Sequence, residues 1–219
     1  MARTKTYGHY CAAARALEMV GEKWALLAVR DLLQGPARFS DLLRSLGGIT
    51  PKLLTVRLRD LEAAGVVERD EEEGRREVWY RLTPAGEELR PVIEALLVWG
   101  LDHAAAPAPG ERVDPQRAAR SAATLLNHRR VRPSQPTVWS LRFGEDPGTS
   151  LRFDGERWSV VRGEQESPAD LTIGTTPDVW VAMIRAQGTQ RAAELARMHL
   201  VGEPARIAEF RRLLLAAVR

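Results

Sequence analysis

The sequence contains one cysteine, Cys11, which excludes an internal disulfide framework and any metal site built from several cysteines. It lacks a run of 18 apolar residues, so we expect no membrane-spanning helix and no membrane partner. The N-terminus reaches Arg15 and Glu18 before an apolar stretch can form, which disfavours a secretory signal and makes a cytoplasmic location the expectation. A P-loop, a dinucleotide fingerprint and a His-Glu-x-x-His zinc pattern are also missing. We therefore expect a protein that is not an enzyme and that uses no cofactor and no metal.

The net charge of +3 is small for 219 residues, but it is unevenly distributed. Residues 1–103 carry 15 basic and 16 acidic side chains, whereas residues 104–219 carry 17 and 13. Within the first part, the stretch from Arg38 to Arg59 holds five basic residues against Asp41 alone. The local basic stripe on a neutral domain is the informative pattern, because the small overall charge does not by itself indicate nucleic acid.

The composition changes at residues 104–115, where the sequence AAAPAPGERVDP is rich in alanine and proline. Such a stretch is typical of a linker. We therefore predict a first domain at 1–103, a linker at 104–115 and a second domain at 116–219.

The first domain reads as a series of helices followed by a β-hairpin. Ser40 is expected to cap the third helix, Thr50-Pro51 to open the fourth, and Pro91 to kink the last. The predicted helices span 11–20, 23–33, 39–46, 50–64 and 83–103, and the predicted strands span 66–69 and 77–82.

The third and fourth predicted helices, joined by a glycine turn, have the anatomy of a helix-turn-helix. Leu54, Leu58 and Leu61 share one face of the fourth helix, and Arg57 lies near it, in a position suited to a structural ion pair or a flanking phosphate. The opposite face, which a recognition helix presents to the major groove, holds Lys52, Thr55, Val56 and Arg59.

These residue types suit DNA, because lysine and arginine neutralise phosphates or donate to guanine, and threonine and valine contact thymine methyl groups. A solvated helix face that needs charges for solubility is an equal alternative. The hairpin favours DNA, since Arg75 and Arg76 near its tip are suited to the minor groove. The acidic run at 70–73 argues against it.

Several motifs in this region resemble the HxlR family of bacterial winged-helix regulators over about residues 7–103. They include Gly21-Glu-Lys-Trp-Ala-Leu-Leu, Gly35-Pro-Ala-Arg-Phe-Ser-Asp-Leu, Gly48-Ile-Thr-Pro-Lys-Leu-Leu and Tyr80-Arg-Leu-Thr-Pro-Ala-Gly. The resemblance implies a homodimer that binds double-stranded DNA at an inverted repeat, with the terminal helices of the domain at the dimer interface. It also implies that Thr50, Lys52, Thr55, Val56 and Arg59 face the major groove, that Phe39-Ser40 opens the supporting helix, and that Arg75-Arg76 lies on the wing.

Some members of this family sense oxidants through a cysteine near the N-terminus, and Cys11 occupies that position. Nearby Lys5, His9 and Arg15 favour the thiolate. The competing interpretation, which we favour, is a small packing residue at the dimer interface.

The second domain is predicted to combine an antiparallel sheet with covering helices, so that the whole chain belongs to the α+β class. The stretch from Ala169 to Leu214 resembles the sterol carrier protein-like fold, which implies an apolar tunnel for a greasy small molecule. Plain core packing is the alternative for each candidate, and we find no charged residue placed to hold a lipid head group. The candidate lining residues are Trp139, Trp158, Trp180, Met183, Leu195, Met198 and Phe210.

The leading hypothesis is a dimeric DNA-binding transcription regulator whose second domain binds a hydrophobic small-molecule effector. The first alternative is a carrier of lipids or acyl chains that uses the winged helix mainly to dimerise. The second alternative is a redox sensor based on Cys11.

Overall fold

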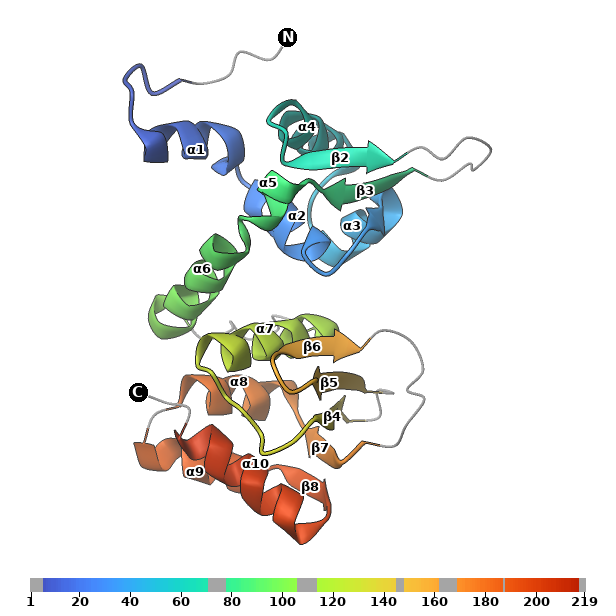
Figure 1. The fold of residues 1–219 in the computed structure, drawn as a ribbon, viewed down its shortest axis with the longest axis vertical. Coiled ribbons are helices and arrows are strands. Elements are labelled where there is room, and N and C mark those ends of the chain that lie inside the picture. Colours follow the sequence, from blue (N-terminus) through green and yellow to red (C-terminus); the bar gives the residue numbers. More distant parts are fainter. Residues whose placement is uncertain are drawn as a thin grey trace. The chain divides into compact units, whose positions relative to one another are not determined.

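The computed structural model describes residues 6–70, 78–105, 114–144, 148–161, 169–186 and 188–216. The contacts within the chain divide it into two compact units, Met1–Ile93 and Glu94–Arg219 (Figure 1). This division falls earlier in the chain than the predicted linker at 104–115, of which residues 106–113 lie outside the described ranges. Each unit has its own hydrophobic core. In the described part of the chain, no helix has the length and apolar character needed to cross a membrane.

The first unit packs helices on a small antiparallel sheet of strand order β1-β3-β2. The β2–β3 hairpin was predicted from the sequence, but β1 was not, because a strand of two residues carries no alternating pattern. The elements are α1 (Ala12–Val20), α2 (Ala25–Leu32), β1 (Ala37–Arg38), α3 (Phe39–Leu46), α4 (Pro51–Ala63), β2 (Val67–Asp70), β3 (Trp79–Leu82) and α5 (Pro84–Glu87), followed by α6 (Arg90–His103), in which the two units meet along the chain.

Side chains at the helix starts explain where α3, α4 and α5 begin. The Thr50 hydroxyl accepts a hydrogen bond from the Leu53 amide at the start of α4, as the sequence predicted. The prediction that Ser40 caps α3 is wrong, because the N-cap is Arg38 and Ser40 lies exposed inside the first turn. The Asp41 carboxylate, three residues after the cap, accepts from the Arg38 amide and replaces the expected serine.

The helix predicted from Thr83 to His103 is also incorrect, since the chain forms the separate helices α5 and α6. The interruption lies before Pro91 rather than at it, so Pro91 sits in the first turn of α6. A proline lacks an amide hydrogen, and the first turn is where that hydrogen has no helical partner to lose. Pro91 therefore starts a helix instead of kinking one.

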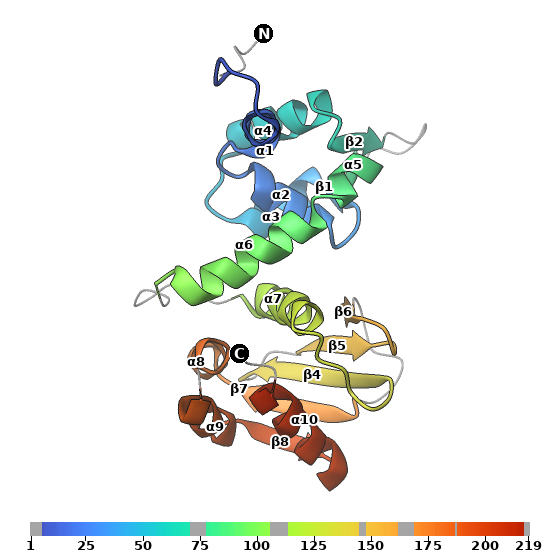
Figure 2. The same cartoon turned by 60° about the vertical axis from the view of Figure 1, so that its left-hand side comes forward.

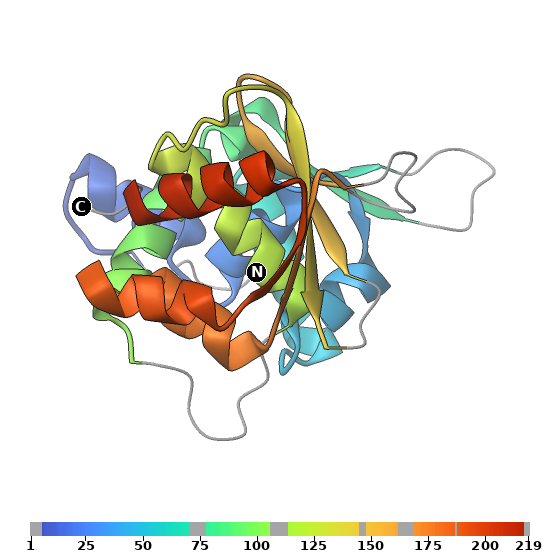
Figure 3. The ribbon, with the colours of Figure 1, turned by 90° about the horizontal axis from the view of Figure 1, so that it is seen from below.

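The second unit is a five-stranded sheet with helices packed on one face, as Figure 3 shows from the end of the sheet. Its buried side chains, including Leu141, Leu151 and Ile173, alternate along the strands with exposed ones. The elements are α7 (Pro115–His128), β4 (Thr137–Phe143), β5 (Thr149–Phe153), β6 (Trp158–Val161), β7 (Leu171–Thr175), α8 (Pro177–Arg185), α9 (Gly188–Ala196), β8 (His199–Gly202) and α10 (Pro204–Ala216).

The sheet has the strand order β6-β5-β4-β7-β8 and is mixed (Figure 2). The predicted antiparallel arrangement is correct for β4, β5 and β6 but wrong for β7, which pairs parallel to β4 with Trp139 opposite Leu171. The chain passes from β6 at one edge to the far side of β4, and no local turn signal encodes such a crossover. The edge strand β8 was not predicted, because its side chains do not alternate between buried and exposed positions.

Candidate functional site

Helix α4 has a buried face and an exposed face, as its sequence predicted. Leu54, Leu58 and Leu61 are completely or almost completely buried in the core of the first unit. Lys52 and Arg59 are exposed on the opposite side, and neither has an ion-pair partner among the described residues. The helix is 13 residues long and follows α3 after the Gly47-Gly48 turn. Two uncompensated cations therefore lie on the solvent side of a helix that its leucines hold firmly.

The other predicted contact residues of α4 have mixed environments. The Thr55 hydroxyl donates to the carbonyl oxygen of Pro51 at 3.0 Å, which leaves its methyl group and its acceptor capacity for an outside partner. Val56 is 37% exposed and also lines a groove between α1 and α4. Thr50 is exposed, but its hydroxyl is occupied in capping. Lys52 and Arg59 thus remain the most available groups on this face.

Arg57 behaves differently from Arg59, two residues further along. Its side chain is 14% exposed, and it forms ion pairs with Glu22 at 3.1 Å and with Asp60 at 2.7 Å. Its Nε also donates to the carbonyl oxygen of Lys23. Arg57 is therefore committed to joining α4 to the segment before α2, which confirms its predicted structural role.

The predicted wing is described only in its two strands, and Arg75 and Arg76 lie outside the described residues. On the described strands, Arg81 pairs with Glu68 at 2.7 Å and lies 3.8 Å from Asp70. Asp70, the described member of the acidic run at 70–73 that argued against DNA, therefore lies near a positive charge.

Apolar side chains are exposed on the terminal helices of the winged region. Helix α1 exposes Leu17 and Met19, which line the groove beside α4, a space of about 830 Å³. Cys11, immediately before α1, is a free and exposed thiol. Helix α6 exposes Val92, Leu96 and Trp99.

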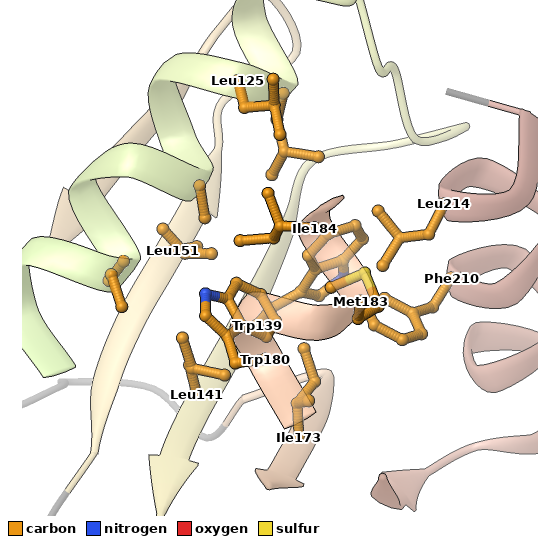
Figure 4. Packing of buried hydrophobic residues seen from close by; sticks show 14 of the residues in the cluster. Leu125, Trp139, Leu141, Leu151, Ile173, Trp180, Met183, Ile184, Phe210 and Leu214 are labelled. Atoms are coloured by element: carbon orange, nitrogen blue, oxygen red, sulfur yellow. The ribbon is translucent and has the colours of Figure 1, made fainter. Parts of the chain in front are cut away.

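The second unit contains a cavity of about 40 Å³ between α7, the sheet, α8 and α10 (Figure 4). Four predicted lining residues do border it, namely Trp139, Trp180, Met183 and Phe210. The remaining candidates, Trp158, Leu195 and Met198, are buried in the surrounding core and do not line it. The volume equals about three water-sized groups.

Two arginines missed by the sequence reasoning also line this cavity, Arg129 and Arg191. Arg191 is only 4% exposed. The signal was present, because Arg191 and the buried Leu195 are four residues apart on α9 and so share its inward face. Burial, followed by the positive charge of Arg129, lowers the pKa of Arg191 to about 10. The side chain nevertheless stays charged at neutral pH.

Groups of three or more histidine, cysteine, aspartate or glutamate side chains placed to hold a metal ion were not found within the described ranges. The site chemistry is thus that of exposed cations on α4 and of an apolar, positively charged cavity.

Comparisons with known proteins concern mainly the first unit. A family model described as HxlR-like helix-turn-helix matches residues 19–107. An uncharacterised HTH-type transcriptional regulator of Synechocystis is 38% identical over 96 residues, covering 43% of this chain and 71% of the relative. The HTH-type regulator YkvN of Bacillus subtilis is 40% identical over 84 residues, covering 38% and 71%. A solved structure of the redox regulator HypR in its oxidised form is 33% identical, covers 41% of this chain and 94% of its own, and has a TM-score of 0.40.

Proposed function

This chain belongs to the HxlR-like helix-turn-helix family of transcriptional regulators, and we propose that it binds an inverted-repeat operator as a homodimer through α4. The observation that carries the proposal is the pair of unpartnered cations, Lys52 and Arg59, on the exposed face of that helix. The family relationship supports a DNA-binding regulator rather than an enzyme.

The α4 face suits the major groove in size and chemistry. Lys52 and Arg59 are seven residues apart, so they are separated by about 10 Å along the helix axis. The major groove is about 12 Å wide and admits one helix. Lys52 and Arg59 contact phosphates or guanine edges, while the Thr55 methyl group and Val56 contact thymine methyl groups. Ser40 and Thr50 lie at the starts of the two helices and contact the flanking backbone.

The β2–β3 hairpin supplies a second contact in this proposal. Arg75 and Arg76, between the two strands in sequence, reach the minor groove or its phosphates. The hairpin contact orients α4, and the base contacts of α4 provide the sequence discrimination.

Dimerisation is proposed through the terminal helices. The supporting observation is that α1 and α6 expose large apolar side chains, among them Leu17, Met19, Leu96 and Trp99. Large exposed apolar side chains on a helix of a regulator of this family fit a second copy of the same chain. Two-fold symmetry then places two copies of α4 on two half-sites of an inverted repeat.

The second unit is proposed to bind a hydrophobic small molecule that changes operator affinity, in a sterol carrier protein-like domain. The support is the cavity lined by Trp139, Trp180, Met183 and Phe210. Such an effector must bind the DNA-competent and DNA-incompetent dimers with different affinities. Drug-sized ligands occupy pockets of about 300–1,000 Å³. The cavity of about 40 Å³ therefore favours a small effector over a carrier of whole lipids.

A gel-shift assay at fixed salt, with DNA from upstream of the protein's own gene, tests the DNA proposal. The double variant Lys52→Ala/Arg59→Ala should bind at least about tenfold more weakly and show a smaller salt dependence. The matched control Arg142→Ala/Arg152→Ala removes two exposed cations from the second unit and should bind normally. Equal affinity of the two double variants would refute the assignment of α4 as the recognition helix.

A further inference from the structure

Arg191 is a buried cation whose hydrogen-bonding capacity is only partly used. Its guanidinium donates to the carbonyl oxygens of Leu214 and Ile184, each at 3.3 Å, and to that of Ala186. Its Nε atom is buried and has no partner among the described residues. A buried charge is costly unless an opposite charge compensates for it. Carbonyl dipoles alone leave the positive charge of Arg191 uncompensated.

Arg129, the second cation at this cavity, is half-buried. The acidic groups of the second unit that form ion pairs within the described ranges do so elsewhere: Glu194 pairs with Arg197, and Glu209 pairs with Arg206 and Arg212. None of them pairs with Arg129 or Arg191. The two arginines therefore repel each other across a space that holds no carboxylate from the described chain, which is consistent with the lowered pKa of Arg191.

Trp180 adds a third donor to the same cavity. Its indole Nε1 is buried and has no partner in the described part of the chain. The other lining side chains, among them Leu151, Phe210 and Leu214, are apolar. A cavity with apolar walls and only donors among its polar side chains is complementary to a ligand with an apolar body and an anionic acceptor.

We propose that this cavity binds a small monocarboxylate with a short apolar body, and that Arg191 and Arg129 hold its carboxylate. The proposal rests on the ligand-binding role proposed above for the second unit and names the chemical class of the ligand. The unpartnered Nε of Arg191 offers one charge-assisted hydrogen bond to such a carboxylate, and the Arg129 guanidinium at the same cavity offers the second. The small cavity limits the ligand to a carboxylate with one or two further carbon atoms, and the flexible Met183 adapts to the difference.

Titration of the full chain with acetate and propionate, each compared with the alcohol of the same length, tests this inference. Binding is followed by calorimetry and by the fluorescence of the tryptophans that line the cavity. We expect each carboxylate to bind saturably and at least about tenfold more tightly than its alcohol, because only the anion compensates for the buried charge.

Four variants separate the charge effect from the fold. Arg191→Met and Arg129→Met should each weaken carboxylate binding at least about tenfold and leave alcohol binding unchanged. Ala122→Leu fills the cavity and should abolish binding of both ligands. Arg197→Met is the control, because Arg197 is exposed, follows α9 and pairs with Glu194 instead. If Arg191→Met does not fold, Arg129→Met and Ala122→Leu decide the question.

Equal affinity for carboxylate and alcohol would overturn the carboxylate inference while leaving an apolar ligand site in the second unit. No binding of either ligand would overturn the inference and the proposed ligand site together. Carboxylate binding that survives Arg129→Met or Ala122→Leu would place the ligand elsewhere and also overturn the inference. The proposal that α4 binds DNA does not depend on any of these outcomes.

Discussion

The Arg57 guanidinium lies 3.1 Å from the Glu22 carboxylate and joins helix α4 to the segment that precedes α2. Arg59, two residues later on the same helix, is exposed and has no ion-pair partner in the described ranges. A helix turns by about 100° per residue, so two positions place the side chains about 200° apart. The same residue type therefore serves two purposes on α4, one internal to the fold and one directed outward.

The two arginines should respond differently to the same substitution. Arg57→Met removes two ion pairs and a hydrogen bond to the Lys23 carbonyl, and should lower the free energy of unfolding by about 1 kcal/mol. Arg59→Met should leave stability within about 0.5 kcal/mol and weaken operator binding. Urea denaturation and a gel-shift assay measure the two effects. A strong loss of stability in Arg59→Met would contradict this division of roles.

The buried carboxylate of Asp31 provides a second test within the first unit. It accepts a hydrogen bond from the Ser45 hydroxyl at 2.6 Å, which links α2 to α3, and it pairs with Arg30 at 2.9 Å. Ser45→Ala leaves a buried oxygen without one of its donors and should cost about 1–3 kcal/mol. The control is Ser40→Ala on the same helix, which should cost less than about 0.5 kcal/mol because Ser40 is exposed and caps nothing. Thermal denaturation measures both losses. A loss in Ser40→Ala as large as the one expected for Ser45→Ala would contradict the assignment of Arg38 as the N-cap, and a loss in Ser45→Ala as small as the one expected for Ser40→Ala would contradict the stabilising bond to Asp31.

The parts of the fold that the sequence predicted are those with local signals. The Thr50-Pro51 pair fixes the start of α4, and the spacing of Leu54, Leu58 and Leu61 fixes its buried face. Ser40 misled the prediction because the sequence pattern does not distinguish a serine at the cap from one in the first turn. The parallel pairing of β4 with β7 joins segments that are distant in sequence, so no turn residue predicts it.

The candidate sites follow the same rule. Lys52 and Arg59 could be found because one helix carries them both. The spacing of Arg191 and Leu195 indicated only that Arg191 lies on the inward face of α9. Its surroundings could not be predicted, because the carbonyl groups of α8, of the segment after it and of α10 come together only in the folded chain. The sequence indicated no charged residue placed to hold a head group. This prediction is wrong, because Arg129 and Arg191 line the cavity.

The proposed dimer predicts a specific effect of charge on α6. Trp99 is 61% exposed and Leu96 is 47% exposed. Leu96→Glu should place a charge in the interface of two copies and shift the protein towards the monomer, as measured by light scattering after size-exclusion chromatography. The control Val201→Glu introduces the same charge at an exposed position on β8 and should leave the oligomeric state unchanged. A wild-type monomer at micromolar concentration, or a dimer in Leu96→Glu, would contradict the proposed interface.

Glu209 gives the second unit a contribution to stability that depends on pH. Burial raises the pKa of its carboxyl, but hydrogen bonds from the Ser134 amide, at 2.8 Å, and from Arg206 outweigh burial and lower the pKa below its usual value. The folded state thus favours the carboxylate, so its stabilising effect is present above the unfolded pKa, which is about 4.3. The effect is lost as the pH falls through the lower pKa of the folded state.

Glu209→Gln keeps an acceptor for Ser134 but removes the charge, and should cost about 1 kcal/mol at pH 7. Because protonation of the wild-type carboxyl removes the same charge, this difference in free energy of unfolding should shrink below about pH 4. Chemical denaturation of both proteins between pH 3 and pH 7 measures it, and a difference that stays constant over that range would show that Glu209 acts without its charge.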